Sequence, residues 1–297
     1  MKNLITIASL VLLVACGCRK SEPAKQEPST SALRETTSAK PDPAQPQPRE
    51  PERKGDFVAA FTGPLLIPQQ RNPNISYSFN PAWERYFVHV PKEYSGETTY
   101  GLIVFTDAND EFNQLPDGWR DVLDSRKYLF VATQNAGNDQ YINRRLGLAV
   151  FGAMEMMKHY RIDPNRVYAA GFSGGARMSG LLGFYQSDIF RGTIQNCGVD
   201  FYRAVPMVVA TSPLDTAGQP YGVLTATAAE VAAARQVRFA LITGTNDFRR
   251  GNIIDIFNGG FAREGFQAKL FDVPGMAHDI AGAETLSAVL DFLEASR

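Results

Sequence analysis

Short apolar runs alternate with segments of helical periodicity over most of the chain. The runs predict strands at 85–90, 102–105, 128–132, 167–170, 193–195, 239–243 and 269–273. The continuous apolar run at 102–105 is typical of a strand buried on both faces. Apolar residues spaced three or four apart predict helices at 146–157, 176–185, 252–263 and 286–293. Strands that alternate with helices form a mostly parallel sheet with helices on both faces, so the pattern predicts an α/β fold.

The first residues have the pattern of an export signal. Lys2 precedes an apolar run, Leu4–Ala15, which is shorter than the roughly 20 residues that a membrane-spanning helix needs. The run ends in Leu13-Val14-Ala15-Cys16, which resembles the lipobox of bacterial lipoproteins. The resemblance implies cleavage before Cys16 and attachment of lipid to its thiol, so residues 1–15 are expected to be a signal peptide. The alternative is a plain signal peptide whose cysteine is incidental.

A proline-rich segment separates this signal from the folded part of the chain. Residues 19–54 hold seven of the 18 prolines, and Leu33 is the only large apolar residue among them. Such a segment cannot bury enough apolar surface to offset the entropy lost on ordering. We therefore expect 16–54 to be a lipidated N-terminus with a disordered linker, and 55–297 to be a single folded domain.

Composition excludes several classes of function. The formal net charge is -1, with 44% apolar and 21% charged residues, so the chain has no basic surface for nucleic acid. Cys197 is the only cysteine beyond the N-terminal segment, which excludes a disulfide framework, and we expect it to be a buried apolar residue. The histidines lie too far apart in sequence for a metal-binding motif. We expect neither a metal nor an organic cofactor.

A nucleophile is predicted within Gly171-Phe172-Ser173-Gly174-Gly175. This Gly-x-Ser-x-Gly motif follows the predicted strand at 167–170 and begins the predicted helix at 176–185. A serine on such a strand-to-helix turn projects its hydroxyl from the sheet, and the flanking glycines allow strand and helix to approach closely. The alternative is a glycine-rich turn with no chemical role.

A serine hydroxyl needs a base and an orienting acid before it becomes a strong nucleophile. His278 follows the last predicted strand and precedes the final helix, so it is the predicted base. Asp247 follows the predicted strand at 239–243 and is the predicted acid, with Asp255 and Asp272 as less well placed alternatives. The chain order serine, aspartate, histidine is that of α/β-hydrolases.

The segment from Arg85 to His278 resembles the esterase group that contains feruloyl esterases, acetylxylan esterases and polyhydroxybutyrate depolymerases. The similar pieces are the segments 160–168, which leads into the Ser173 turn, 244–247 and 273–278. This resemblance implies the α/β-hydrolase fold, a mostly parallel central sheet with helices on both faces. It also implies hydrolysis of esters, without indicating which ester.

The segment after the strand at 102–105 departs from this group. The group usually carries His-Gly there, and its loop supplies one backbone amide to the oxyanion hole. Here Asp107 and Ala108 take those positions, so the resemblance places this donor at the amide of Asn109. The other donor is expected at the amide of Gly174, directly after the nucleophile.

Two further segments could contribute to substrate binding. Residues 199–235 lie where the group often inserts a cap, and they hold aromatic residues and a helix candidate at 226–234. We expect the aromatics to pack onto the sheet, with a pocket wall as the alternative. Arg249 and Arg250 could bind a substrate carboxylate, but a solvated loop is the favoured interpretation.

The sequence therefore predicts an exported serine hydrolase that cleaves carboxylic esters through an acyl-enzyme. Its expected partners are an ester substrate, free or linked to a polysaccharide or other polymer, and a membrane that holds the lipid anchor. The expected location is the bacterial cell envelope, at the outer membrane in a Gram-negative cell, because Gly17 rather than aspartate follows Cys16. Two alternatives stay open: a serine peptidase of related fold, and a non-catalytic glycan- or polymer-binding lipoprotein with a vestigial triad.

Overall fold

The computed structural model describes residues 53–64, 75, 77, 79–210 and 226–296. These residues belong to the second of two compact units, Pro48–Arg297. The predicted signal peptide, Cys16 and nearly all of the predicted linker lie outside the described residues. Among the described helices, none combines the length and apolar character needed to cross a membrane.

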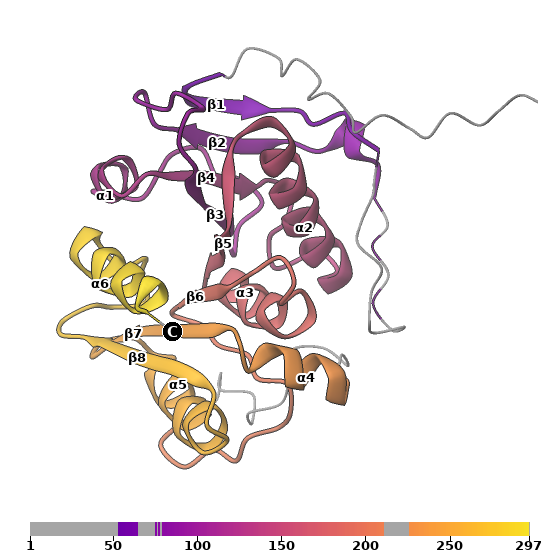
Figure 1. The fold of residues 1–297 in the computed structure, drawn as a ribbon. Coiled ribbons are helices and arrows are strands. Elements are labelled where there is room, and N and C mark those ends of the chain that lie inside the picture. The colour runs from indigo at the N-terminus through magenta and orange to yellow at the C-terminus, as the bar shows by residue number, and fades with distance from the viewer. Residues whose placement is uncertain (1–52, 65–74, 76, 78, 211–225, 297) are drawn as a thin grey trace, which may run out of the picture. The chain divides into compact units, whose positions relative to one another are not determined.

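One eight-stranded sheet forms the centre of this unit, in the order β1-β2-β4-β3-β5-β6-β7-β8 (Figure 1). The strands β1 and β2 pair antiparallel, as do β2 and β4, and every later pair is parallel. The strands are β1 Gly55–Ala59, β2 Tyr86–Val90, β3 Tyr100–Thr106, β4 Tyr128–Thr133, β5 Ile162–Phe172, β6 Gly192–Asn196, β7 Arg238–Gly244 and β8 Gln267–Val273.

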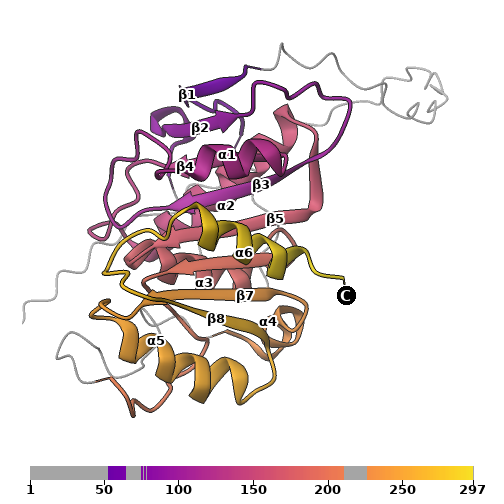
Figure 2. The same cartoon turned by 90° about the vertical axis from the view of Figure 1, so that its left-hand side faces the viewer.

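Helices cover both faces of the sheet. In Figure 1, α1 and α6 lie on one side of the strands and α2, α3 and α4 on the other, and Figure 2 shows α1 and α6 in front of the sheet. The helices are α1 Trp119–Ser125, α2 Ile142–His159, α3 Gly174–Tyr185, α4 Ala228–Ala234, α5 Arg250–Ile256 and α6 Ala283–Glu294. A short 3-10 helix, Pro81–Trp83, precedes β2, and a π-helical segment, Phe257–Ala262, extends α5. This architecture confirms the predicted α/β fold.

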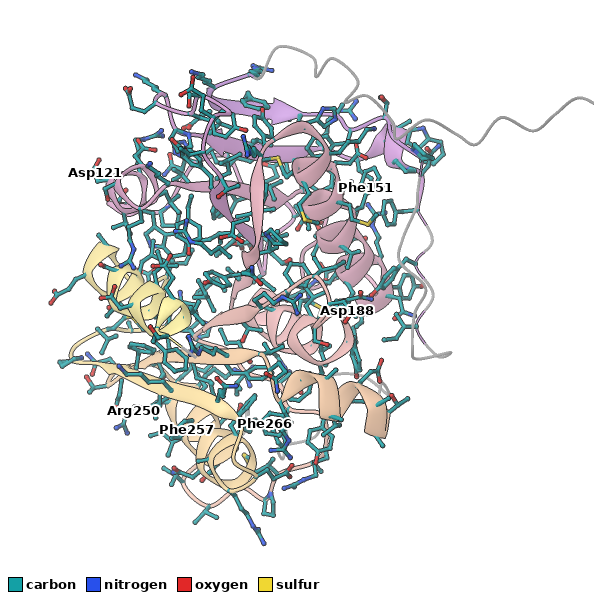
Figure 3. The ribbon with its side chains drawn as sticks, in the orientation of Figure 1. Asp121, Phe151, Asp188, Arg250, Phe257 and Phe266 are labelled. Atoms are coloured by element: carbon teal, nitrogen blue, oxygen red, sulfur yellow. The ribbon has the colours of Figure 1, made fainter. Side chains whose placement is uncertain are left out.

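Two hydrophobic clusters pack against the two faces of the sheet. The larger one includes buried residues of α2, α3 and α5, and the smaller one includes those of α1 and α6. Phe151 on α2 and Phe266 just before β8 both belong to the larger cluster and are labelled in Figure 3. Phe201 is also buried in this cluster, so the sequence expectation that it packs onto the sheet is confirmed.

Three described elements were missed by the sequence pattern, the 3-10 helix Pro81–Trp83, β1 and α1, and all are short. β1 is an edge strand whose residues alternate between half-buried and exposed, so it has no continuous apolar run. α1 spans two turns and buries only Trp119 and Leu123. Elements of this length depend on tertiary packing more than on their own periodicity.

The parallel strands determine where loop residues meet. Ser173 follows β5, Asp247 comes soon after β7, and His278 comes after β8. The strands β5, β6, β7 and β8 are neighbours and run in the same direction. The three loops therefore emerge at the same edge of the sheet, which is where open α/β sheets bind ligands.

Candidate active site

Ser173 occupies a strained turn between β5 and α3. Its backbone has φ 53° and ψ -115°, which non-glycine residues rarely adopt. Glycine at 171 and 175 makes this turn possible, because a Cβ on Gly171 would collide with the backbone of Gly175, and a Cβ on Gly175 with the carbonyl oxygen of Thr106. The Ser173 backbone N–H donates to Asn196 O on β6 at 2.9 Å, which ties the turn to the neighbouring strand.

The three predicted side chains form one hydrogen-bonded chain. His278 Nε2 lies 3.0 Å from Ser173 Oγ, and His278 Nδ1 lies 2.7 Å from Asp247 Oδ1. Both distances are within hydrogen-bonding range. The Asp247 side chain is fully buried, whereas 18% of the His278 side chain is exposed. An imidazole held in this way can accept the Ser173 proton at one nitrogen while the other donates to a carboxylate.

Hydrogen bonds keep Asp247 ionised in spite of its burial. Desolvation favours the neutral acid, but donors from His278, the Arg249 backbone and the Thr243 hydroxyl outweigh it and hold the Asp247 pKa below its ordinary value. The Arg249 N–H is 2.9 Å from Oδ1, and the Thr243 hydroxyl donates to Oδ2 at 2.8 Å. The Asp247 carboxylate is therefore an anionic acceptor for His278.

The loop that carries His278 is fastened to the end of β6. Asn196 accepts from the Ala281 N–H at 3.3 Å, and Asn196 Nδ2 donates to Asp279 O at 3.4 Å. The Cys197 thiol also donates to Asp279 O, at 3.2 Å. Cys197 is buried as predicted, and burial together with the nearby Asp247 charge raises its pKa. The thiol thus helps to hold the histidine loop in place.

The two alternative acids have other partners. Asp255 Oδ2 accepts from the backbone N–H groups of residues 208, 209 and 210 at 2.7 to 2.8 Å, so it holds the 208–210 segment on α5. Asp272 pairs with Arg250 at 2.5 Å on the surface. The structure therefore brings Asp247 to His278 and leaves Asp255 and Asp272 elsewhere.

The amide of Asn109, which the resemblance implied as an oxyanion-hole donor, has a hydrogen-bond partner in its own loop. Its backbone N–H already donates to Asp107 Oδ1 at 2.8 Å, and its side-chain amide donates to the same oxygen at 3.0 Å. Burial raises the pKa of Asp107 even though these donors lower it. The buried Arg145 holds the loop by donating to Asp107 O at 3.0 Å and to Ala136 O at 2.6 Å. The esterase group has His-Gly where this chain has Asp107-Ala108. In this chain the Asn109 amide therefore donates to a carboxylate of its own loop.

Because the Asn109 N–H donates to Asp107, Asn109→Pro is expected to affect stability more than turnover. Asn109→Pro removes an N–H that Asp107 accepts, so it should lower the free energy of unfolding by about 1–3 kcal/mol. It should change kcat on an activated ester less than about tenfold. Asn109→Ala keeps the backbone amide and is the matched control. A loss of about 10²–10³ in kcat for the proline variant alone, with an unchanged melting temperature, would return Asn109 to the oxyanion hole.

A small cavity of about 170 Å³ opens beside Ser173. Gly174, which we predicted as an oxyanion donor, lines it, and Asn109 does not. Asn138, from the loop after β4, lines the wall next to Gly174 so closely that a Cβ on Gly174 would collide with its side chain. Asn138 is fixed to the Asp107–Asn109 loop by its N–H, which donates to Ala108 O at 2.8 Å.

One group of described residues has the composition of a metal site. Ligand atoms of Cys197, Asp247 and His278 lie within 4.8 Å of one another. A thiol must lose its proton to bind a metal, and burial raises the Cys197 pKa. Asp247 and His278 already share a hydrogen bond. The donor set therefore suits proton transfer at Ser173 better than metal binding.

Sequence reasoning missed several contributors to this site. Asn138 lies in a loop that has no recognisable motif. Phe248 is 48% exposed and lies against His278, with ring centroids 4.2 Å apart. Gly198 lets the turn after β6 approach the nucleophile, because a Cβ there would collide with Ser173 O. Gly198 follows a buried strand and Cys197 directly. A glycine at such a place can mark a close approach of two backbone segments, and this is the one sequence signal that could have identified it.

Comparisons with known proteins agree with this geometry at the level of the fold. No family model matches the chain, and no curated protein matches it in sequence. A ferulic acid esterase structure is similar with a TM-score of 0.54 and 16% identity, over 82% of this chain and 98% of that one. S-formylglutathione hydrolase from Staphylococcus aureus has a TM-score of 0.56 and 13% identity, over 80% and 98%. The esterase Est22 has a TM-score of 0.51 and 15% identity, over 72% and 76%.

These likenesses and the sheet topology define the fold. The chain has the α/β-hydrolase fold, as its sequence resemblance implied.

Proposed function

We propose that the chain is an extracytoplasmic serine hydrolase that cleaves carboxylic esters through an acyl-enzyme intermediate. Ser173 is the nucleophile, His278 the base and Asp247 the orienting acid. The observation that carries the proposal is the continuous hydrogen-bonded chain from Ser173 Oγ through both His278 nitrogens to the buried Asp247 carboxylate. The esterase names of similar structures agree with this chemistry.

Acylation begins when Ser173 Oγ attacks the ester carbonyl carbon. His278 Nε2 takes the hydroxyl proton as the new bond forms, and Asp247 stabilises the resulting imidazolium. The carbonyl oxygen becomes an oxyanion, which the backbone N–H of Gly174, the first residue of α3, stabilises. When the carbon–oxygen bond of the ester breaks, His278 returns its proton to the leaving alcohol. The acyl group is left on Ser173.

Deacylation repeats these steps with water as the nucleophile. His278 removes a proton from water, the hydroxide adds to the acyl carbon, and the second oxyanion collapses as Ser173 Oγ takes the proton from His278. The products are a carboxylic acid and the regenerated serine. No step needs a metal or an organic cofactor.

Covalent labelling by a fluorophosphonate tests this mechanism directly, because only an activated serine reacts. We expect one label on Ser173 and hydrolysis of members of a panel of acyl, feruloyl and acetyl-sugar esters. Anilides of the same acyl groups form the control arm. Faster cleavage of the anilides would replace the esterase by a serine peptidase. Complete absence of labelling and hydrolysis would favour a binding protein with a vestigial triad.

We also propose that the protein is anchored by lipid on Cys16, at the outer membrane if the cell is Gram-negative. The support is the apolar run that ends in Leu13-Val14-Ala15-Cys16, followed by Gly17. The predicted linker would place the enzyme at a distance from the membrane. There its proposed substrate is an ester, free or linked to a polysaccharide or other polymer.

Replacing the anchoring residue tests the proposed location. In Cys16→Ser the thiol that takes the lipid is absent, so the protein should be found in the soluble fraction or stay unprocessed. Activity of the folded domain should remain at the wild-type level. Cys18→Ser is the matched control and should stay in the membrane fraction. Unchanged membrane retention and processing of Cys16→Ser would reject the anchor.

A further inference from the structure

The backbone amides that follow β3 face a carboxylate. The Asn109 N–H donates to Asp107 Oδ1 at 2.8 Å. Burial raises the Asp107 pKa, and donors that include the backbone of Asn109 and Ala108 oppose this rise. In α/β-hydrolases one oxyanion donor comes from the loop after this strand, and the other is the amide that follows the nucleophile. Gly174 supplies the second of these, so the first place in the hole is open to another group.

Asn138 brings its side-chain amide against Gly174. A Cβ on Gly174 would collide with Asn138 Oδ1, and Asn138 Nδ2 lies 3.2 Å from the position of that Cβ. Asn138, Ser173 and Gly174 line the same cavity. The lack of a side chain at 174 thus makes room for the Asn138 amide beside the N–H that we expect to bind the oxyanion.

The amide of Asn138 can turn its donor toward a ligand. Asn138 is exposed, and within the part of the chain that the structure describes its side chain makes no hydrogen bond. Rotation about the last side-chain bond exchanges Oδ1 and Nδ2. An oxyanion accepts hydrogen bonds and donates none, so it selects the orientation in which Nδ2 faces it.

The backbone beneath this side chain is fixed to the loop after β3. The Asn138 N–H donates to Ala108 O at 2.8 Å, and the Gly137 N–H donates to Asp110 Oδ1 at 2.7 Å. The buried Arg145 donates to one carbonyl oxygen in each of the two loops, at 2.6 and 3.0 Å. A donor whose backbone is held before the reaction stabilises developing charge at little cost of reorganisation.

We propose that the side-chain amide of Asn138 is the second donor of the oxyanion hole, together with the backbone N–H of Gly174. The inference rests on the proposed serine hydrolase function and adds a catalytic residue to it. When Ser173 Oγ bonds to the carbonyl carbon, its proton moves to His278 Nε2 and the carbonyl electron pair moves onto oxygen. Asn138 Nδ2 donates to this anion until the carbonyl forms again and the alcohol leaves.

The test removes the amide and leaves the backbone of the loop unchanged. Asn138→Ala should lower kcat on an activated ester by about 10²–10³ and leave KM within about threefold, because the donor acts on the transition state. Asn138→Asp lacks the donor and adds negative charge beside the anion, so its loss at neutral pH should be at least as large. Asp139→Ala is the matched control, since Asp139 is an exposed neighbour that does not line the cavity, and it should keep wild-type kcat.

A trifluoromethyl ketone gives a readout that a structural role of Asn138 would not change. Ser173 Oγ adds to its carbonyl carbon and forms a stable tetrahedral oxyanion, so the inhibition constant measures how well the protein stabilises that anion. In Asn138→Ala this constant should rise by about the factor by which kcat/KM falls. The melting temperature should stay at the wild-type value, because the substitution removes no hydrogen bond between described residues.

The outcomes separate this inference from the function on which it rests. If the wild-type protein is labelled at Ser173 and Asn138→Ala keeps kcat within about tenfold, the second donor is another group and the esterase remains. A rise in KM alone, or a fall in kcat with an unchanged inhibition constant, also overturns the inference. If the wild-type protein is not labelled and cleaves no ester, the proposed function fails and the role of Asn138 fails with it.

Discussion

Replacing Ser173 by alanine is expected to reduce kcat for ester hydrolysis by about 10⁶, the scale on which removal of a triad serine acts in other enzymes. The alanine variant has no Oγ to attack the carbonyl and no proton for His278 to accept at 3.0 Å. Folding should be retained, because the turn is determined by Gly171, Gly175 and the bond from the backbone of residue 173 to Asn196. Single-turnover and steady-state assays of purified protein would measure the loss.

Ser125→Ala is the matched control for this variant. Ser125 is an exposed serine at the end of α1, where its hydroxyl donates to the backbone of its own helix. It should keep wild-type kcat and should still react with a fluorophosphonate. If Ser173→Ala retains a tenth of wild-type turnover with an unchanged melting temperature, the nucleophile is another group.

The triad could be predicted because the positions and the parallel direction of the strands can be inferred from the sequence. Most of the parallel strands are buried and largely apolar, so their ends could be located from residues such as 239–243. The strand at 269–273 is only partly buried and includes Lys269 and Asp272. Residues that follow the carboxyl ends of neighbouring parallel strands must meet at one edge. Ser173, Asp247 and His278 each follow such an end, and they form the hydrogen-bonded chain that their order implied.

The loop after β3 could not be predicted in the same way. Its path depends on contacts between segments that are distant in sequence, above all the two hydrogen bonds from the buried Arg145 to Asp107 O and Ala136 O. The local sequence indicated only that the usual glycine was missing. It could not reveal that the Asp107 carboxylate would accept the Asn109 amide, or that Asn138 would line the cavity in place of Asn109.

The directions of the arginine side chains could not be predicted from the sequence either. From sequence, Arg249 and Arg250 were an indistinguishable pair, and Arg177 was one polar residue of a helix. The structure separates them, because Arg250 turns toward Asp272 on β8 while Arg249 and Arg177 line the cavity of Ser173. The direction of a long side chain is set by the partners that the fold provides, and the sequence does not show these partners.

Asp247→Asn is expected to lower kcat by about 10⁴, the effect of the equivalent change in a well-studied triad. The asparagine side chain can donate to His278 Nδ1, which stabilises the tautomer with its proton on Nε2. That nitrogen then faces Ser173 Oγ as a donor and cannot accept its proton. The substitution preserves size and the acceptor for the Thr243 hydroxyl, so the fold should remain intact near neutral pH. Kinetics at saturating ester and circular dichroism would measure the two effects.

The pH dependence of stability gives this prediction a second readout. The folded state holds the Asp247 pKa below its ordinary value of 3.8, so its carboxylate stabilises the fold at pH values above that. This contribution is lost as the pH falls through the lowered pKa. The asparagine variant lacks a group that titrates there, so its deficit in melting temperature relative to the wild type should shrink as the pH falls through this acidic range.

Asp255→Asn and Asp272→Asn complete the comparison as rival acids. Asp255 holds three backbone N–H groups and Asp272 an arginine, so each change should alter stability more than turnover, with kcat within about tenfold of wild type. If Asp255→Asn lowered kcat by orders of magnitude while Asp247→Asn did not, the orienting acid would be Asp255. In that case the 2.7 Å bond between Asp247 and His278 would have only a structural role.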